Sequence, residues 1–408
     1  MNDKPASAAS RVDASATEPE TAPAEQSAEP ELDARGKAAR WVGALVMLYL
    51  LVCAVDVIGD GFGLIAGDRA EGMFEFATNP FVGLAVGILG TVLMQSSSTT
   101  TAITVGLVAG GLPVEIAVPM IMGANVGTTI TNTLASLANA GKKDAFRRSF
   151  AAATVHDVFN LLAIVVILPL ELLTGFLART AGALAGSLRG ADGADPSQVD
   201  VLDFITSPVL DAFTGFVAAV TSSDLVEGIV LAAAGVVGIL VSVRVLGVLL
   251  GQLMVGRAKR ILHATMGRGP VSGVAAGAGV TVLAQSSSVT TSLMIPLAGS
   301  GTVSLKQIYP YTVGANIGTT FTAILASLAA SQNQVEATQI AFVHLGFNLV
   351  ATLVIFVLPF LRQIPMQGAT LLANQAVVRP WIVVVWVLGV FVAVPAAVIL
   401  LSVTGGIS

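Results

Sequence analysis

The sequence predicts an all-α polytopic membrane protein with two inverted-topology repeats, whose broken or re-entrant helices each carry a Gln-Ser-Ser-Ser (QSSS) motif. Composition is the first observation: 54% of residues are hydrophobic and 11% are charged, whereas an average soluble domain has about 25% charged residues. The second observation is hydropathy, since several apolar runs reach the length of about 17–25 residues that spans a bilayer. They are 41–58, 149–170, 226–252, 338–361 and 381–403.

The third observation is an internal duplication of three polar blocks, which occur in the same order in both halves of the chain. Their separations are nearly constant, at 190, 191 and 188 residues. Such a repeat is typical of transporters that are built from internal repeats around a central site. The matching blocks are TVLMQSSSTTT (91–101) with TVLAQSSSVTT (281–291), GANVGTTITNTLASLA (from Gly123) with GANIGTTFTAILASLA (from Gly314), and VHDVFNLL (from Val155) with VHLGFNLV (from Val343).

The N-terminal segment 1–40 is predicted to be a disordered cytoplasmic tail. It is rich in Ala, Pro, Glu, Ser and Thr, a composition that buries little apolar surface, and it lacks the basic and then apolar pattern of a signal peptide. Residues 41–79 should contain the first transmembrane helix and a linker. Because Arg35, Lys37 and Arg40 precede that helix, the positive-inside rule places the N-terminus in the cytoplasm.

The remaining segments follow from the charge pattern. We expect repeat 1 at 80–178, an acidic extracytoplasmic loop at 179–225, a connecting transmembrane helix and basic cytoplasmic loop at 226–270, repeat 2 at 271–361 and a C-terminal transmembrane helix at 362–408. Basic clusters lie at 142–148 and 257–268, and both should be cytoplasmic. Repeat 1 would then end, and repeat 2 begin, on the cytoplasmic face, which makes the two repeats inverted.

Each QSSS motif interrupts an apolar segment, 80–111 or 271–301. Non-helical backbone at membrane depth is tolerated only where it is buried in protein or lines a water-filled cavity. Gln, Ser, Thr and Asn offer neutral oxygens that suit Na⁺, and broken helices add free carbonyls for cations and free N–H groups for anions. Neither motif region contains Lys or Arg, so we expect helix ends and bound cations to offset the charge of an anion. The alternative is that these hydroxyls only connect helices.

Asp157 is an acidic residue inside an apolar helix block, and the second repeat has Leu345 in its place. An ionisable group within a membrane span is costly and by default suggests function. Asp157 and Asn160 are three residues apart and could share a cation; the alternative is an ion pair between Asp157 and Arg147 or Arg148. His156 and His344 recur at matching positions, where we expect packing hydrogen bonds rather than a metal site.

These blocks, together with the run AFRRSFAAATVHDVFN, resemble the type II sodium-dependent phosphate cotransporter family over about residues 75–170 and 265–360. The resemblance implies uptake of inorganic phosphate driven by Na⁺, by alternating access. It implies no enzymatic activity, no cofactor besides Na⁺ as the coupling ion and no other metal. The loop at 180–225 lacks the cysteine pair of the animal relatives, so their disulfide-bearing loop has no counterpart here.

Carried over position by position, the resemblance implies two sets of binding residues. The phosphate set is Gln95, Ser96, Ser97, Ser98, Asn125, Thr128 and Ser287. The sodium set is Gln285, Ser286, Ser288, Asn316, Thr319 and Thr322, with Asp157 and Asn160 as an additional site. Electrogenic members of the family carry Asp at the position of Asp157, so the resemblance favours electrogenic transport.

The expected partners are inorganic phosphate, Na⁺, the lipid bilayer and a second copy of the chain in a homodimer. The expected location is the cell (plasma or inner) membrane, crossed several times. Nucleic-acid binding has no support, because the chain has no basic domain and no aromatic–basic pattern. Transport of arsenate or sulfate is an alternative. Further alternatives are a non-transporting scaffold and an intramembrane serine hydrolase, for which the chain lacks a G-x-S-x-G context at either motif.

Overall fold

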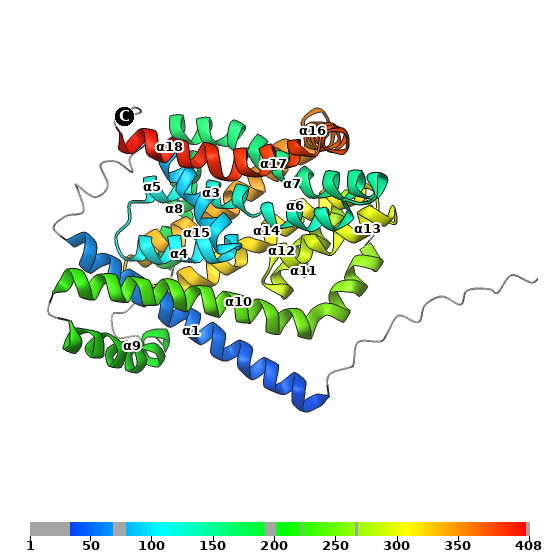
Figure 1. Ribbon diagram of the computed structural model, residues 1–408. Helices are drawn as coiled ribbons and strands as arrows, with labels where there is room; N and C mark the ends of the chain where they lie inside the picture. Colours follow the sequence, from blue (N-terminus) through cyan, green and yellow to red (C-terminus); the bar gives the residue numbers. More distant parts are fainter. Residues whose placement is uncertain (1–32, 68–78, 192–200, 222, 266–267, 405–408) are drawn as a thin grey trace, which may run out of the picture.

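The computed structural model describes residues 33–67, 79–191, 201–221, 223–265 and 268–404, and throughout these ranges the regular structure is helical (Figure 1). Helices long and apolar enough to cross a membrane number seven among the described residues. They are Ala34–Ala66, Val114–Asn139, Lys143–Thr174, Asp224–Leu253, Leu305–Ala329, Gln334–Val357 and Trp381–Val403. Four of the five apolar runs lie within helices of this set, and the run 338–361 extends past the end of its helix at Val357. The prediction of an all-α polytopic membrane protein is confirmed.

Helices make up both halves of the chain, separated by short connections. In chain order they are α1 (Ala34–Ala66), α3 (Pro80–Met94), α4 (Ser97–Ala109), α5 (Val114–Gly127), α6 (Ile130–Ser136), α7 (Lys143–Thr174), α8 (Phe176–Ala191), α9 (Val201–Val220), α10 (Asp224–Thr265), α11 (Pro270–Ala284), α12 (Ser287–Ser292), α13 (Met294–Ser300), α14 (Leu305–Ala329), α15 (Gln334–Ala351), α16 (Pro359–Val378), α17 (Trp381–Leu388) and α18 (Val394–Val403). Two π-helical turns, Thr352–Val357 and Gly389–Ala393, follow α15 and α17.

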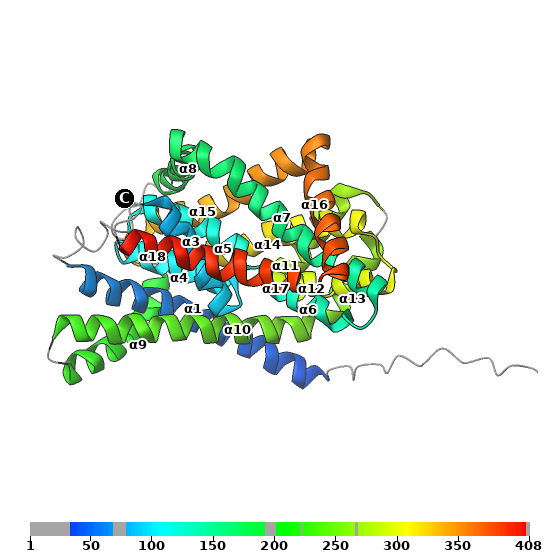
Figure 2. The ribbon, with the colours of Figure 1, turned by 45° about the horizontal axis from the view of Figure 1, so that its top comes forward.

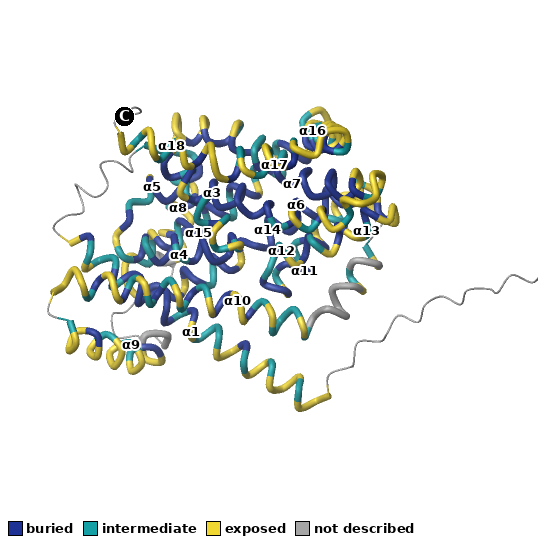
Figure 3. The backbone as a smooth tube through the Cα atoms, in the orientation of Figure 1, coloured by how far each residue is buried: buried dark blue, intermediate teal, exposed yellow. Residues whose placement is uncertain are grey.

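Helices α1 and α10 form a long antiparallel pair along one side of the molecule (Figures 1 and 2). Small residues allow the two backbones to approach closely, as is common between membrane helices. A Cβ atom added at Gly61 would lie 2.3 Å from the backbone nitrogen of Ala232. Exposed residues are frequent on α1, α9 and α10, whereas buried residues concentrate in central helices such as α5, α14 and α15 (Figure 3).

The first helix begins at Ala34, within the range 1–40 that the sequence assigned to the tail. The cause is a helix cap, because a carboxylate oxygen of Asp33 accepts a hydrogen bond of 2.8 Å from the backbone N–H of Gly36. Such a cap satisfies an N–H group that has no partner within the helix. Residues 1–32, which form most of the predicted tail, lie outside the described residues.

The range 179–225, which we expected to be a loop, is mostly helical. It contains most of α8 and all of α9. Helix α8 is stabilised by one apolar stripe, since Leu177, Ala181 and Ala185 recur every fourth residue and are buried where α8 packs against α15. The acidic residues at 192, 195 and 200 lie outside the described residues.

A matching helix pair lies at the centre of each repeat. Helix α3 packs against α5, and α11 packs against α14. Each pair depends on glycines at equivalent positions, where a Cβ atom would collide with the backbone of the facing helix. That atom would lie 2.0 Å from the carbonyl oxygen of Met120 if added at Gly87, and 1.9 Å from the carbonyl oxygen of Tyr311 if added at Gly277.

Other contacts join the two halves of the chain, and these too occur in matching pairs. Helix α7 packs against α16 while α15 packs against α8, and α4 packs against α14 while α12 packs against α6. The largest core cluster draws buried side chains from both halves, among them Phe159 of α7 and Phe347 of α15. Neither half therefore has a complete core by itself.

We expect Gly277→Ala to destabilise the protein, because the new methyl group must push α11 away from α14. Overpacking of this kind costs about 1–3 kcal/mol or more. Thermal unfolding of the detergent-solubilised protein, followed by size-exclusion chromatography, would measure the loss.

Gly279→Ala is the matched control on the same helix, since no atom lies within 4 Å of a Cβ added there. Alanine is favoured over glycine in a helix by up to about 1 kcal/mol, so this variant should be at least as stable as the parent. Equal stability of the two variants would contradict the close packing of α11 on α14.

Candidate functional site

Both QSSS motifs lie at a break between two helices. Helix α3 ends at Met94, and Gln95 takes a left-handed conformation with φ of 54°. Ser96 is extended, and its hydroxyl caps the start of α4 by accepting a hydrogen bond of 3.2 Å from the N–H of Thr99. A left-handed glutamine is unusual, so it needs support from its surroundings.

The second motif repeats this geometry. Gln285 follows α11 with φ of 50°, and the hydroxyl of Ser286 accepts a 3.2 Å hydrogen bond from the N–H of Val289. The same conformations at equivalent residues of the two motifs indicate that this local structure is built into the motif itself.

The two glutamine side chains fix the breaks in the same way. The amide of Gln95 donates to the carbonyl oxygen of Val92 at 2.6 Å, and its Oε1 accepts from the hydroxyl of Thr131 at 3.3 Å.

The amide of Gln285 likewise donates to the carbonyl oxygen of Val282 at 2.7 Å, and its Oε1 accepts from the hydroxyl of Thr322 at 3.0 Å. Each glutamine thus ties its broken helix to the GAN-x-GTT block of its own repeat.

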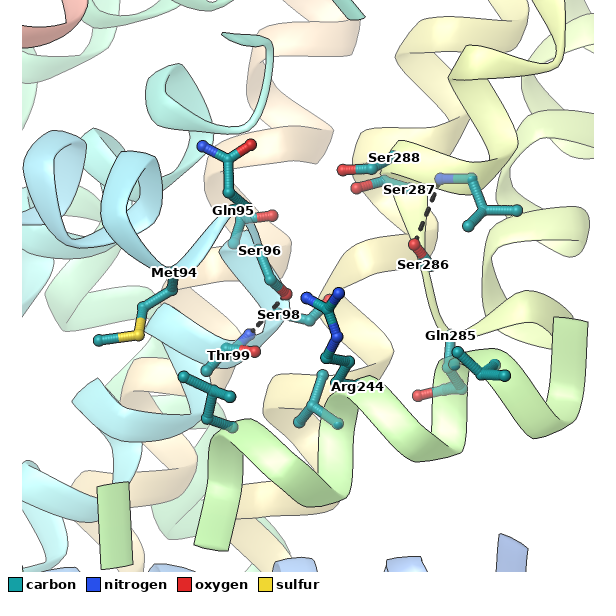
Figure 4. A pocket seen from close by; sticks show the side chains of 16 residues that line it. Met94, Gln95, Ser96, Ser98, Thr99, Arg244, Gln285, Ser286, Ser287 and Ser288 are labelled. Atoms are coloured by element: carbon teal, nitrogen blue, oxygen red, sulfur yellow. Dashed lines mark hydrogen bonds between the residues drawn. The ribbon is translucent and has the colours of Figure 1, made fainter. Parts of the chain in front are cut away.

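A cavity of about 250 Å³ lies where the two motifs face one another (Figure 4). Residues 95–99 line it from repeat 1, residues 285–289 line it from repeat 2, and α10 closes another side. The N–H groups of Ser97 and Ser98 open α4 and have no acceptor within that helix. The cavity therefore offers hydroxyls and free amide donors, which suit an anion.

Arg244 is a cavity residue that the motifs did not predict. Neither motif region contains a basic residue, and the structure brings a cation to the cavity from α10. In Figure 4 the guanidinium points from α10 into the space between the motifs. A signal was present in the sequence, because Arg244 is the one charged residue between 228 and 256 in an otherwise apolar run.

Some of the predicted site residues line this cavity, and others lie outside it. Asn125, Thr128, Asn316, Thr319 and Thr322 do not line the cavity. The hydroxyls of Thr128 and Thr319 donate to backbone carbonyls of their own helices, at 3.0 and 2.9 Å. The predicted residues that line the cavity are Gln95, Ser96, Ser97, Ser98, Gln285, Ser286, Ser287 and Ser288.

A deeper network joins the two repeats through buried amides. The amide of Asn160 donates to the backbone carbonyl of Asn125 at 2.7 Å, and its Oδ1 accepts from the amide of Asn316 at 2.8 Å. The Oδ1 of Asn316 lies 2.5 Å from Nε2 of His156, which places the ring proton on Nε2. His156 thus makes the packing hydrogen bond expected of it, and it does so between α7 and α14.

The second repeat lacks the equivalent bonds. Both ring nitrogens of His344 are buried without a hydrogen-bond partner among the described residues, and so is Oδ1 of Asn348. These residues occupy the positions of His156 and Asn160. Helix α15, which carries them, packs against α5 and hence against the helix of Asn125. The hydrogen bonds of His156 and Asn160 in repeat 1 are therefore formed, whereas polar atoms of His344 and Asn348 in repeat 2 have no partner among the described residues.

Asp157 is fully buried but does not pair with an arginine. Its Oδ2 accepts hydrogen bonds from the indole of Trp386 at 2.7 Å and from the hydroxyl of Thr133 at 3.4 Å. The Thr129 hydroxyl also interacts with this carboxylate. Its Oδ1 has no partner among the described residues. A buried carboxylate with a free oxygen is costly unless a cation or donor joins it.

The predicted alternative, an ion pair with Arg147 or Arg148, is wrong. Arg147 pairs with Asp144 at 3.0 Å, and Arg148 donates to the backbone carbonyl of Gly299 at 2.6 Å. Both arginines lie near the start of α7, about two turns or more from Asp157. Asn160, which could share a cation with Asp157, bonds instead to Asn125 and Asn316 in this structure.

Comparisons with a family model and with known proteins point to the same family. The sequence model described as Na⁺/Pi-cotransporter matches residues 50–183 and 239–373. The chain is similar to sodium-dependent phosphate transport protein 2A of Rattus norvegicus, with 34% identity over 88% of this chain and 67% of the relative. It is also similar to protein 2B of Homo sapiens, with 30% identity over 92% of this chain and 68% of the relative. No solved structure matches the chain significantly.

We expect Trp386→Phe to lower the thermal unfolding midpoint, because the buried carboxylate of Asp157 loses its indole donor. Leaving such a group unsatisfied costs about 1–3 kcal/mol. Unfolding in sodium-free detergent buffer would measure the change.

Trp381→Phe is the control, since Trp381 lies on the same helix and its side chain is exposed. The midpoint of this variant should equal that of the parent. A Trp386→Phe variant as stable as this control would rule out a stabilising bond to Asp157.

Proposed function

This chain belongs to the Na⁺/Pi-cotransporter family and is a sodium-coupled phosphate transporter, not an enzyme; we propose that it imports inorganic phosphate by alternating access. The observation that carries the proposal is the cavity in which the QSSS motifs of both repeats face each other. A ligand held there would touch both halves of the protein, as a site at a repeat interface requires.

The proposed anion site consists of the motif residues that line this cavity. The hydroxyls of Ser97, Ser98 and Ser287 can donate to phosphate oxygens, and so can the free N–H groups that open α4. Helix starts favour anions because their N–H groups are unpaired and their dipole end is positive. Gln95 and Ser96 would contribute mainly by holding this geometry, since their side chains already bond within the motif.

We propose a sodium site where Gln285 meets Thr322. The Oε1 of Gln285 and the hydroxyl of Thr322 are 3.0 Å apart, and both are neutral oxygens of the kind that hard cations bind. Ser286 and Ser288 adjoin Gln285 in the motif, and Thr319 lies one helical turn before Thr322. The matching pair in repeat 1, Gln95 and Thr131, offers the same two kinds of oxygen atom to a cation.

A further sodium site is proposed at Asp157. Its Oδ1 is fully buried without a partner among the described residues, and the hydroxyl oxygens of Thr129 and Thr133 are close to the same carboxylate. A bound Na⁺ would neutralise the carboxylate and complete its contacts. Asn160 could join this site only after its bonds to Asn125 and Asn316 break. One net charge moved across ~100 mV is worth about 2.3 kcal/mol, which is about a fiftyfold gain in accumulation.

Alternating access is supported by the asymmetry of the buried network. His156 and Asn160 of repeat 1 bond to Asn316, whereas His344 and Asn348 of repeat 2 have polar atoms without a partner in the described ranges. In inverted-repeat transporters the two repeats exchange conformations between the inward and outward states. We propose that the opposite state breaks the bonds of His156 and forms equivalent bonds from His344 to Asn125.

The proposed location is the cell membrane, with a cytoplasmic N-terminus. Arg35, Lys37 and Arg40 are in the first turns of α1, and basic residues next to a span favour the cytoplasmic side. The antiparallel course of α1 and α10 (Figure 1) brings the basic end of α10 to the same side as the start of α1. This arrangement supports the inverted orientation of the two repeats.

Uptake of radiolabelled phosphate into proteoliposomes tests the function, with the parent protein compared with Asp157→Gly. The parent should take up phosphate only with an inward Na⁺ gradient, and an inside-negative potential should increase the rate. Asp157→Gly should still transport but should no longer respond to the potential, because the charge that accompanies the additional Na⁺ is not carried.

An equal K⁺ gradient is the control for sodium dependence, and unlabelled arsenate and sulfate as competitors test anion choice. Uptake that is the same with K⁺ would refute sodium coupling. A normal response of Asp157→Gly to the potential would refute the proposed site at Asp157.

His156→Phe and His344→Phe are a matched pair that tests the exchange of bonds. His156→Phe should lower the unfolding midpoint, at a cost of about 1–3 kcal/mol, because Asn316 loses its partner. His344→Phe should leave the midpoint unchanged or raise it, since neither ring nitrogen of His344 has a partner among the described residues in this state. Phosphate uptake should fall in both variants.

The combination of unchanged stability and reduced uptake in His344→Phe is the informative result. Uptake at the parental rate, or destabilisation as large as that of His156→Phe, would contradict a role for His344 in the opposite state.

A further inference from the structure

We propose that Arg244 is the residue that binds the charge of the transported anion, with its guanidinium placed against phosphate oxygens in the cavity between the QSSS motifs. This inference rests on the proposed function, since it concerns the same cavity. It adds a binding residue from α10, a helix that carries neither motif and belongs to neither the α3–α5 pair nor the α11–α14 pair (Figures 1 and 4).

The position of Arg244 in the membrane span is the first argument. It lies within the apolar stretch Asp224–Leu253 of α10, at some distance from both ends. Charged residues within spans are costly, and they usually face a cavity and mark the path of a substrate. Arg244 lines the cavity together with Leu240, Val243 and Gly247, and all of these neighbours on α10 are uncharged.

The second argument is that the guanidinium has no partner. Among the described residues, Arg244 makes neither a side-chain hydrogen bond nor an ion pair. Arg147 and Arg148 differ, since Arg147 pairs with Asp144 and Arg148 donates to the backbone carbonyls of Ala298 and Gly299. No Asp or Glu of the described ranges lines the cavity. A cation is thus held at the cavity without the anion that would neutralise it.

An unpaired guanidinium group is chemically suited to bind phosphate. The guanidinium is planar and always charged, and it presents paired N–H groups that bind two oxygens of a phosphate at once. The hydroxyls of Ser97, Ser98 and Ser287 line the same cavity and supply further donors. A neutral ligand would leave the positive charge unpaired, so the cavity selects for anions. A low-dielectric wall such as α10 strengthens the attraction.

The helix that carries Arg244 gives the residue a second property. Helix α10 packs mainly along α1, and it touches α4 of one repeat and α11 of the other. An anion bound to Arg244 and to both motifs would therefore connect the two repeats to the α1–α10 pair. The positive charge stays with the protein during the cycle, so Arg244 adds to affinity without adding to the transported charge.

The test compares Arg244→Gln and Arg244→Lys with the parent in phosphate uptake at saturating Na⁺. Charge-assisted hydrogen bonds are worth enough to change affinity by about ten- to a hundredfold. Arg244→Gln should raise the KM for phosphate by about that factor and abolish the thermal stabilisation of the detergent-solubilised protein by phosphate. Arg244→Lys keeps the charge but loses the two-oxygen geometry, so its KM should be intermediate.

Arg379→Gln is the control for loss of a positive charge, since Arg379 is exposed at the end of α16, away from the cavity. Its KM should equal that of the parent. An arginine-specific dicarbonyl reagent gives an independent measurement: it should inactivate the parent, phosphate should protect against it, and Arg244→Lys should resist it.

The outcomes separate this inference from the function on which it rests. If the parent shows no sodium-dependent phosphate uptake, the proposed function fails first. If the parent transports phosphate and folded Arg244→Gln keeps the parental KM and phosphate stabilisation, the guanidinium does not bind the anion and the inference is wrong. If Arg244→Gln does not fold, Arg244→Lys decides the question. A parental KM for Arg244→Lys, together with full sensitivity to the dicarbonyl reagent, would also overturn the inference.

Discussion

The structure depends on one constraint, which is that backbone N–H and C=O groups need partners inside a membrane. Both QSSS motifs interrupt an apolar helix and so leave such groups without helical partners. The structure meets the constraint in two ways. The side chains of Gln95 and Gln285 bond back to the carbonyl groups of the preceding helices, and the remaining donors face a cavity. The same break that is costly in lipid thus provides a site for a polar ligand.

Close packing makes this arrangement possible. Glycines at matching positions let α3 lie against α5 and α11 against α14, with their backbones in contact. The threonines of the GAN-x-GTT blocks can then reach the glutamines, as Thr322 reaches Gln285. Each helix pair thus positions its own motif, while the cavity itself lies between the two motifs. A site shared in this way responds to any relative movement of the two repeats, which is the property that a coupled transporter needs.

The two halves are alike in their central helix pairs and unlike in their buried polar contacts. Asn316 gathers His156 and Asn160 around it, while His344 and Asn348 have polar atoms without partners among the described residues. Unsatisfied buried groups are costly, and a duplicated sequence has no local reason to satisfy one set only. The difference is explained if the chain alternates between two states of similar energy that satisfy the two sets in turn. Asp157 adds a difference that is fixed in the sequence, since only repeat 1 has the carboxylate.

The sequence by itself determined the class of the protein, its duplication and the location of the helix breaks, because these depend on composition, hydropathy and local conformational preference. It also identified the motif residues that line the cavity, since each motif shapes its own backbone. Tertiary structure alone decided the rest. Which of the predicted residues line the cavity depends on helix placement, and Asn125 and Thr128 do not line it; Asp157 meets Trp386, which is 229 residues away, rather than Arg147 or Arg148. Arg244 reaches the motifs only because α10 packs across both repeats. Contacts between residues far apart in the chain depend on the relative placement of whole helices, and no local pattern records that placement.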